Sequence, residues 1–141
     1  MSAVNKRITV LAVDHNPILL GGIVSLINSE ANLRLVATAG NAADAMALFL
    51  SRSPRIVLMD LDLPDSSALP VIRRIKEYRA EVPIIGLATY EFDRTASAAL
   101  ADGVRAVVSK ERICQDLIPV IHQACGLSKT GGLSDASGLP D

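Results

Sequence analysis

The stretch IVLMDLDLPDSS, residues 56–67, places a carboxylate directly after four apolar residues and continues with a second acid, proline and serines. A run such as IVLM is typical of a strand that is covered on both faces of a sheet. A charged Asp60 beside it is costly to bury unless a cation compensates the charge. The stretch therefore predicts a buried strand whose carboxyl end carries chemistry.

Composition restricts the class of protein. The chain has 141 residues, of which 50% are hydrophobic and 3% aromatic, and its formal net charge is -1. These values fit one compact domain with an aliphatic core. We expect no nucleic acid to bind this domain directly, because no basic excess is present to hold phosphates. No apolar run reaches the roughly 20 residues that span a bilayer, so we expect no membrane contact.

The cysteines and the N-terminus indicate where the protein works. Cys114 and Cys125 fit neither a zinc pair nor a disulfide framework. The N-terminus has no charged segment followed by an apolar leader. Both features favour a reducing cytoplasm.

Five short apolar runs alternate with longer segments of helical periodicity. The expected strands are residues 8–13, 33–38, 55–60, 83–88 and 104–109. The expected helices are residues 17–29, 42–50, 68–79, 94–102 and a fifth that ends near Cys125. This alternation predicts an α/β fold with a doubly wound parallel sheet, right-handed crossovers and helices on both faces.

Residue types at the ends of the segments support these boundaries. Asn41 and Ser67 are expected to cap the second and third helices, and Gly103 to end the fourth. Proline is tolerated in the first turn of a helix, so Pro119 predicts that the fifth helix begins near Gln115 or the residue after it. From residue 126, glycine, serine and proline replace the periodic apolar residues. We therefore expect one domain over 1–125 and a flexible linker or tail over 126–141.

Polar side chains follow four of the five expected strands. They are Asp14 and His15 after the first strand, Asp60 at the end of the third, Thr89 after the fourth and Lys110 after the fifth. Ligands in parallel α/β folds bind beyond the carboxyl ends of the strands, so we expect these side chains to meet there. Taken singly, Asp14 also reads as a helix cap, Thr89 as a turn residue and Lys110 as a solvated lysine. Their occurrence at four strand ends favours a shared site.

Four motifs resemble those of a known family. ITVLAVDHNP (8–17), IVLMDLDLPDSSAL (56–69), IIGLATYE (84–91) and GVRAVVSK (103–110) are similar, in order and spacing, to the response-regulator receiver domains of two-component signalling. The resemblance covers about residues 6–125. It is strongest to receivers that precede a helix-turn-helix DNA-binding output domain. It implies a flavodoxin-like (βα)5 fold with strand order 2-1-3-4-5.

The resemblance also implies a role for each site residue. Asp60 would accept a phosphoryl group from a sensor histidine kinase. The hydroxyl of Thr89 would then hydrogen-bond a phosphoryl oxygen and draw the loop after the fourth strand inward, which is the switch. The ammonium group of Lys110 would neutralise negative charge at the site. Mg²⁺ would be held by Asp14, by Asp60 and by the backbone carbonyl of Asp62. Such a domain would control transcription through an output domain outside these residues. We further expect replacement of Lys110 to change stability by no more than about 1 kcal/mol, as for a surface residue.

Two positions depart from the family pattern. The family normally has two successive acids here, and the second binds the metal. The ungapped match places His15 at the second acid. A gap would restore Asp14 to that place but would leave Val13 at the position of the first acid. Imidazole is a poor ligand for Mg²⁺, so we expect the ion to bind weakly. Val107 stands where the family commonly has an aromatic residue. The alternative is therefore a receiver-fold interaction module impaired in phosphorylation.

A phosphatase of the haloacid-dehalogenase type also uses an Asp-x-Asp motif at a strand end. In that family the motif usually ends the first strand of a longer chain with a cap, whereas here it ends the third expected strand and Pro64 follows. We therefore expect no enzyme activity beyond self-phosphotransfer. A partner surface is also expected, because the small residues Ala96, Ala99 and Ala106 would let the helices of two subunits approach closely. The resemblance to receiver domains implies a weak homodimer that tightens on phosphorylation.

Overall fold

The computed structural model describes residues 7–65, 67–90 and 93–127. Its strands are β1 (Ile8–Val13), β2 (Leu33–Ala39), β3 (Ile56–Asp60), β4 (Ile84–Ala88) and β5 (Ala106–Ser109). Its helices are α1 (Pro17–Asn28), α2 (Ala42–Arg52), α3 (Ala68–Tyr78), α4 (Arg94–Ala101) and α5 (Ile113–Ala124), with a 3-10 helix at Lys110–Arg112. The strands are parallel, in the order β2-β1-β3-β4-β5. The predicted flavodoxin-like fold is confirmed.

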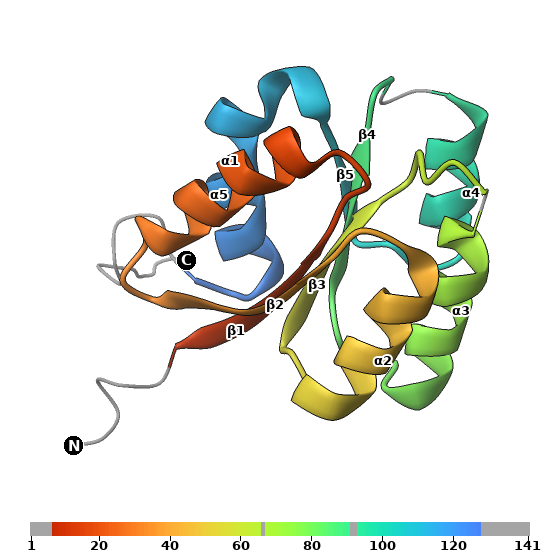
Figure 1. Cartoon of the computed structure of the whole chain (residues 1–141), viewed down its shortest axis with the longest axis horizontal. Coiled ribbons are helices and arrows are strands. Elements are labelled where there is room, and N and C mark those ends of the chain that lie inside the picture. Colours follow the sequence, from red (N-terminus) through yellow and green to blue (C-terminus); the bar gives the residue numbers. More distant parts are fainter. Residues whose placement is uncertain (1–6, 66, 91–92, 128–141) are drawn as a thin grey trace.

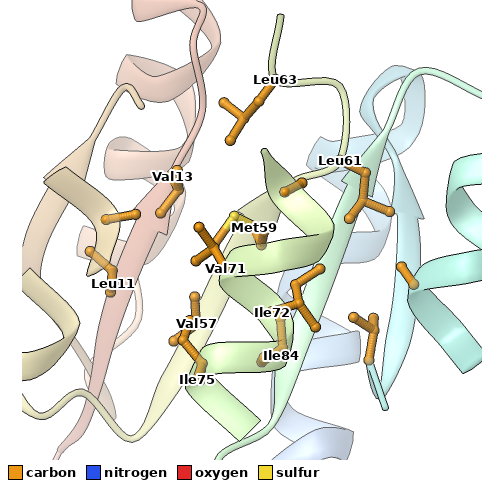
Figure 2. Packing of buried hydrophobic residues seen from close by; sticks show 14 of the residues in the cluster. Leu11, Val13, Val57, Met59, Leu61, Leu63, Val71, Ile72, Ile75 and Ile84 are labelled. Atoms are coloured by element: carbon orange, nitrogen blue, oxygen red, sulfur yellow. The ribbon is translucent and has the colours of Figure 1, made fainter. Parts of the chain in front are cut away.

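Helices cover both faces of the sheet (Figure 1), with α2, α3 and α4 on one face and α1 and α5 on the other. Side chains alternate along each strand, so β3 sends Val57 and Met59 toward the first face (Figure 2). Ile56 and Leu58 of the same strand pack on the second face. All four are fully buried. This two-sided burial explains the nearly continuous apolar sequence of the strands.

The predicted ends of α2, α3 and α4 are confirmed in position, but one expected cap makes no capping hydrogen bond. The Asn41 side chain accepts a hydrogen bond from the Asp44 N–H at 2.8 Å, and Gly103 follows α4 with a φ of +104°. Ser67 stands at the cap position of α3, but its side chain makes no capping hydrogen bond. Its hydroxyl donates to the Asp65 carboxylate instead.

Helix α5 begins earlier than predicted. It starts at Ile113, so Pro119 lies in its interior and the first-turn placement of this proline was wrong. Proline removes the hydrogen bond that the carbonyl of Gln115 would accept. Gln115 is an exposed residue, so water can donate a hydrogen bond to its carbonyl instead. Leu117 and Ile121, on the inward side of the helix, are fully buried. Burial of one face keeps the helix intact despite the lost bond.

The surface predicted for a homodimer is not built from the alanines named for it. Ala96 and Ala99 of α4 are buried in the core, and Ala106 is half-buried. The outer side of α4 instead carries Leu100, which is 48% exposed. Any dimer contact on this helix has to use the outward residues.

Gly86 of β4 lies directly beneath Leu61, the residue that follows the strand-terminal Asp60. A Cβ added at Gly86 would lie 2.7 Å from Leu61 Cδ1, and Leu61 is only 4% exposed. The absence of a side chain at Gly86 therefore lets Leu61 pack against the sheet.

Replacing Gly86 by alanine should lower the free energy of unfolding by about 1–3 kcal/mol, because the new methyl group displaces Leu61 in a full core. Gly21→Ala is the matched control: nothing lies within 4 Å of its added Cβ on the exposed side of α1, so it should stabilise by up to ~1 kcal/mol. Urea unfolding of the two variants should give opposite signs. Equal signs would show that Leu61 moves aside freely.

Candidate functional site

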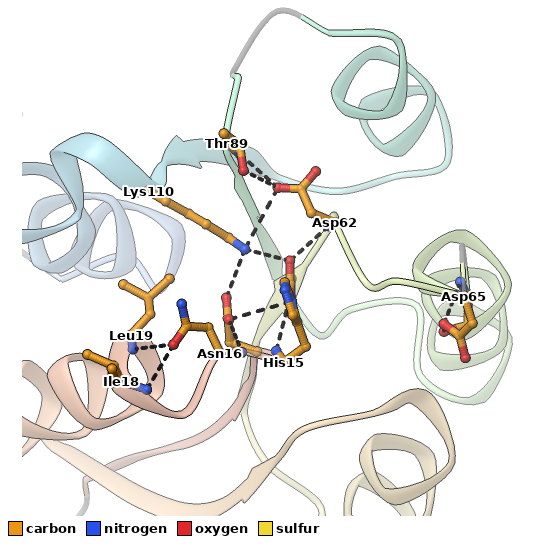
Figure 3. Close-up of polar contacts among 11 residues, drawn as sticks. His15, Asn16, Ile18, Leu19, Asp62, Asp65, Thr89 and Lys110 are labelled. Carbon is orange, nitrogen blue, oxygen red and sulfur yellow. Dashed lines mark hydrogen bonds and ion pairs between the residues drawn. The ribbon is translucent and has the colours of Figure 1, made fainter.

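The polar residues predicted at the strand ends come together, and Figure 3 shows Lys110 pointing toward Asp62, with Thr89 beside Asp62. Asp60 lies at the centre of the contacts with Lys110 and His15. The Asp60 side chain is fully buried, and both of its oxygens accept hydrogen bonds. Oδ1 accepts from Lys110 Nζ and from the Asp62 N–H, each at 2.8 Å. Oδ2 accepts from the His15 N–H at 3.0 Å and lies 2.5 Å from His15 Nδ1.

Asp14 belongs to this site and not to the start of α1. Its side chain is fully buried, and its Oδ1 accepts a hydrogen bond from the Asn16 N–H at 2.8 Å. Asn16 caps α1 by accepting from the N–H groups of Ile18 at 2.9 Å and Leu19 at 3.3 Å. The reading of Asp14 as a helix cap was therefore wrong. An asparagine directly before a proline was the signal that would have identified the cap.

Lys110 is the cation that compensates the buried acids. Its Nζ lies 3.1 Å from Asp14 Oδ2 and 3.7 Å from Asp62 Oδ2, in addition to its bond with Asp60. Its side chain is only 15% exposed. The structure thus does not support the expectation that Lys110 behaves like a surface residue.

Burial and pairing act against each other on the pKa values. Burial by itself raises the pKa of Asp60, but hydrogen bonds from Lys110 and His15 outweigh it, so the pKa of Asp60 is lowered. Burial by itself lowers the pKa of Lys110, but the carboxylates of Asp60 and Asp14 raise it above its ordinary value. Each partner therefore keeps the other charged.

Asp62 takes part through its side chain, which the sequence did not predict. Its Oδ2 accepts hydrogen bonds from both the N–H and the hydroxyl of Thr89, each at 2.8 Å. Thr89, at the end of β4, is thereby joined to the loop that follows β3. The sequence placed both residues at the site but gave no signal for this contact, since it depends on a side-chain rotation.

Asp14, His15 and Asp60 offer ligand atoms within 4.8 Å of one another. Oδ2 of Asp14 is buried and receives no well-directed hydrogen bond, although Lys110 Nζ is within ion-pair distance. Two carboxylates and an oxygen without a hydrogen bond fit a hard cation such as Mg²⁺. The imidazole of His15 does not, because nitrogen ligands suit zinc, copper or nickel better. The donor set fits Mg²⁺ with one anionic ligand fewer than paired acids would supply.

No helix in the described parts of the chain is long and apolar enough to cross a membrane.

Comparison with known proteins gives concordant matches. The model of the response regulator receiver domain matches residues 10–122. The chain is 26% identical over 116 residues to the nitrate/nitrite response regulator protein NarL of Escherichia coli (strain K12), which covers 82% of this chain and 54% of that protein. It is 30% identical over 115 residues to the transcriptional regulatory protein YdfI of Bacillus subtilis (strain 168), with coverages of 82% and 54%. The chain thus spans about half the length of these curated relatives.

Solved structures show the same fold. A two-component response regulator of the LuxR family from Aurantimonas sp. SI85-9A1 superposes with a TM-score of 0.78 at 26% identity, covering 86% of this chain and 87% of that one. The receiver domain of the putative response regulator NarL from Mycobacterium tuberculosis gives a TM-score of 0.76 at 19% identity, covering 86% and 98%. The second match is evidence for the fold alone.

Replacing Lys110 by methionine, which keeps the apolar stem, should lower the free energy of unfolding at pH 7 by about 2 kcal/mol. This is below the 3–5 kcal/mol typical of a fully buried pair, because the side chain is partly exposed. Asp60 has a lowered pKa in the folded state, so its contribution is present above the unfolded pKa and is lost as the pH falls through the folded value. The difference from the wild type should therefore persist down to about pH 4, near the unfolded pKa of an aspartate, and shrink as the pH falls below it.

Arg112→Met is the control, since the Arg112–Asp116 pair is solvent-exposed and should contribute about 0.5 kcal/mol or less. Urea unfolding of the wild type and both variants at pH 7 and at about pH 3 tests this expectation. A loss in Lys110→Met that is the same at both pH values would show that the stem, and not the charge, stabilises the fold.

Proposed function

The chain belongs to the response regulator receiver domain family, and we propose that it accepts a phosphoryl group from a sensor histidine kinase on Asp60. The observation that carries this proposal is the buried Asp60 carboxylate at the end of β3, held as an anion by Lys110 at 2.8 Å. A lowered pKa keeps this carboxylate in its nucleophilic form at neutral pH.

The transfer forms one bond and breaks one. A carboxylate oxygen of Asp60 bonds to phosphorus while the bond from phosphorus to the kinase's histidine nitrogen breaks, and that nitrogen keeps the electron pair. The product is an acyl phosphate on Asp60. Lys110 remains within reach of the carboxylate and stabilises the negative charge that gathers around the phosphoryl group.

His15 has to give way before this reaction can occur. Both oxygens of Asp60 already accept two contacts each, and Oδ2 faces the imidazole at 2.5 Å. The His15 side chain is 39% exposed, so its ring can rotate toward solvent and free Oδ2. In this proposal His15 limits access to the nucleophile.

Mg²⁺, when bound, would supply positive charge that brings the carboxylate and the phosphoryl oxygens together. Asp14 and Asp60 would hold it with the backbone carbonyl of Asp62. With His15 in place of a second acid, we propose that the affinity for Mg²⁺ is low.

The wider role follows from the relatives. We propose that residues 1–125 form the receiver and 126–141 a linker, of which residues 128–141 lie outside the described part of the chain. The domain would act in the cytoplasm and control transcription through an output domain. The Bacillus relative is named a transcriptional regulatory protein, which supports the transcriptional role. Phosphorylation would tighten a homodimer; the exposed Leu100 of α4 is available for such a contact.

A second function is favoured by one specific contact. The short approach of His15 Nδ1 to Asp60 Oδ2 occupies the nucleophile, and Val107 replaces the family's usual aromatic residue. A receiver-fold interaction module with impaired phosphorylation would have these features. Labelling experiments separate the two functions.

Incubation with acetyl phosphate and Mg²⁺ should add one phosphoryl group, measured as intact-protein mass. The gain should be absent in Asp60→Asn, because an amide oxygen cannot form the acyl phosphate. Asp65→Asn, an exposed acid of the loop after β3, is the matched control and should label like the wild type. No labelling of the wild type at saturating Mg²⁺ would favour the impaired module.

His15→Asp should bind Mg²⁺ about tenfold more tightly, equivalent to about 1.4 kcal/mol, because it restores an anionic oxygen ligand. The labelling rate should rise with it. Isothermal titration of the wild type, His15→Asp and the neutral control His15→Asn checks this. Equal affinities in all three would show that residue 15 does not face the ion.

A further inference from the structure

One carboxylate oxygen holds both donors of Thr89. Oδ2 of Asp62 accepts the backbone N–H and the side-chain hydroxyl at 2.8 Å each, as Figure 3 shows. The two residues come from different loops, one after β3 and the other at the end of β4. This double contact joins the residue after β4 to the loop after β3.

The hydroxyl of Thr89 cannot serve two acceptors at once, because a hydroxyl has a single proton to donate. This step rests on the proposed function and on the switch role that the family resemblance implies for Thr89, in which the hydroxyl donates that proton to an oxygen of the phosphoryl group on Asp60. The Asp62 carboxylate and the phosphoryl group are therefore competitors for the same donor.

Charge adds to this competition. Lys110 Nζ lies 2.8 Å from Asp60 Oδ1 and 3.7 Å from Asp62 Oδ2, so one ammonium group faces both carboxylates. A phosphoryl group on Asp60 would place further negative charge near Asp62 and would draw on the same ammonium group. The Asp62 side chain is 27% exposed, so it has a path to solvent.

We propose that Asp62 is a positioning residue whose carboxylate takes the place of a phosphoryl group at Thr89 in the unmodified domain, and that phosphorylation of Asp60 displaces it. Asp62 then sets how readily a phosphoryl group recruits Thr89. It also holds the end of β4 near the site before any signal arrives.

The contact itself is tested without a phosphodonor, by hydrogen exchange of the Thr89 amide. Asp62→Ala should speed this exchange at least tenfold, and Asp62→Asn, which keeps an acceptor oxygen, should give an intermediate rate. Exchange at Leu58 in the core reports that the fold is intact, and Asp65→Ala should leave the Thr89 rate unchanged. A Thr89 rate that is the same in all variants would overturn the proposal.

The displacement is tested by initial labelling rates with acetyl phosphate in a double-mutant cycle. Asp62→Ala should raise the rate severalfold in the wild type, but should have little effect in Thr89→Val, which has no hydroxyl to release. An equal gain in both backgrounds would show that Asp62 acts by charge alone and would overturn the displacement. Absence of labelling in every variant would remove the proposed phosphotransfer and the displacement with it, while amide exchange would still decide the contact.

Discussion

A carboxylate buried at the end of a strand stays charged only if a cation lies beside it, and the site depends on that pairing between Asp60 and Lys110. The parallel sheet makes the pairing possible, since the carboxyl ends of β3 and β5 lie at the same edge. Asp14 joins from β1 and shares the ammonium group. Removal of the cation would leave the two buried acids Asp14 and Asp60 side by side. The charge balance of the site therefore depends on the strand order, which places the ends of β1, β3 and β5 at one edge.

Patterns local in sequence predicted most of the architecture. The apolar runs gave the five strands because both faces of the sheet are covered, as the burial of Val57 and Leu58 illustrates. The meeting of Asp14, Asp60, Thr89 and Lys110 could be predicted because they stand at strand ends. The roles of these residues in phosphotransfer stay predictions, as does the division between domain and tail.

Other features depend on packing or rotamers that a single sequence does not reveal. Pro119 is accommodated inside α5 because burial of one helix face outweighs a lost hydrogen bond, whereas proline statistics place it in a first turn. Ala96 and Ala99 have the small size of interface residues, yet the rotation of α4 turns them into the core. The carboxylate of Asp62 points to Thr89 because it accepts hydrogen bonds from the N–H and the hydroxyl of that residue. No spacing rule predicts this contact.

Leu61 stands between the two acids Asp60 and Asp62, and its side chain is fixed over Gly86 while its N–H donates to the Leu87 carbonyl at 2.8 Å. The backbone on both sides of this leucine therefore loses its conformational freedom when the protein folds. The entropy of ordering this segment is lost at that stage and not during the reaction. Little reorganisation of the main chain is then left for the moment of reaction, so the motions that remain are side-chain rotations, which take picoseconds to nanoseconds at exposed positions. Local switching at this site can therefore be fast even if the response of the whole domain is slow.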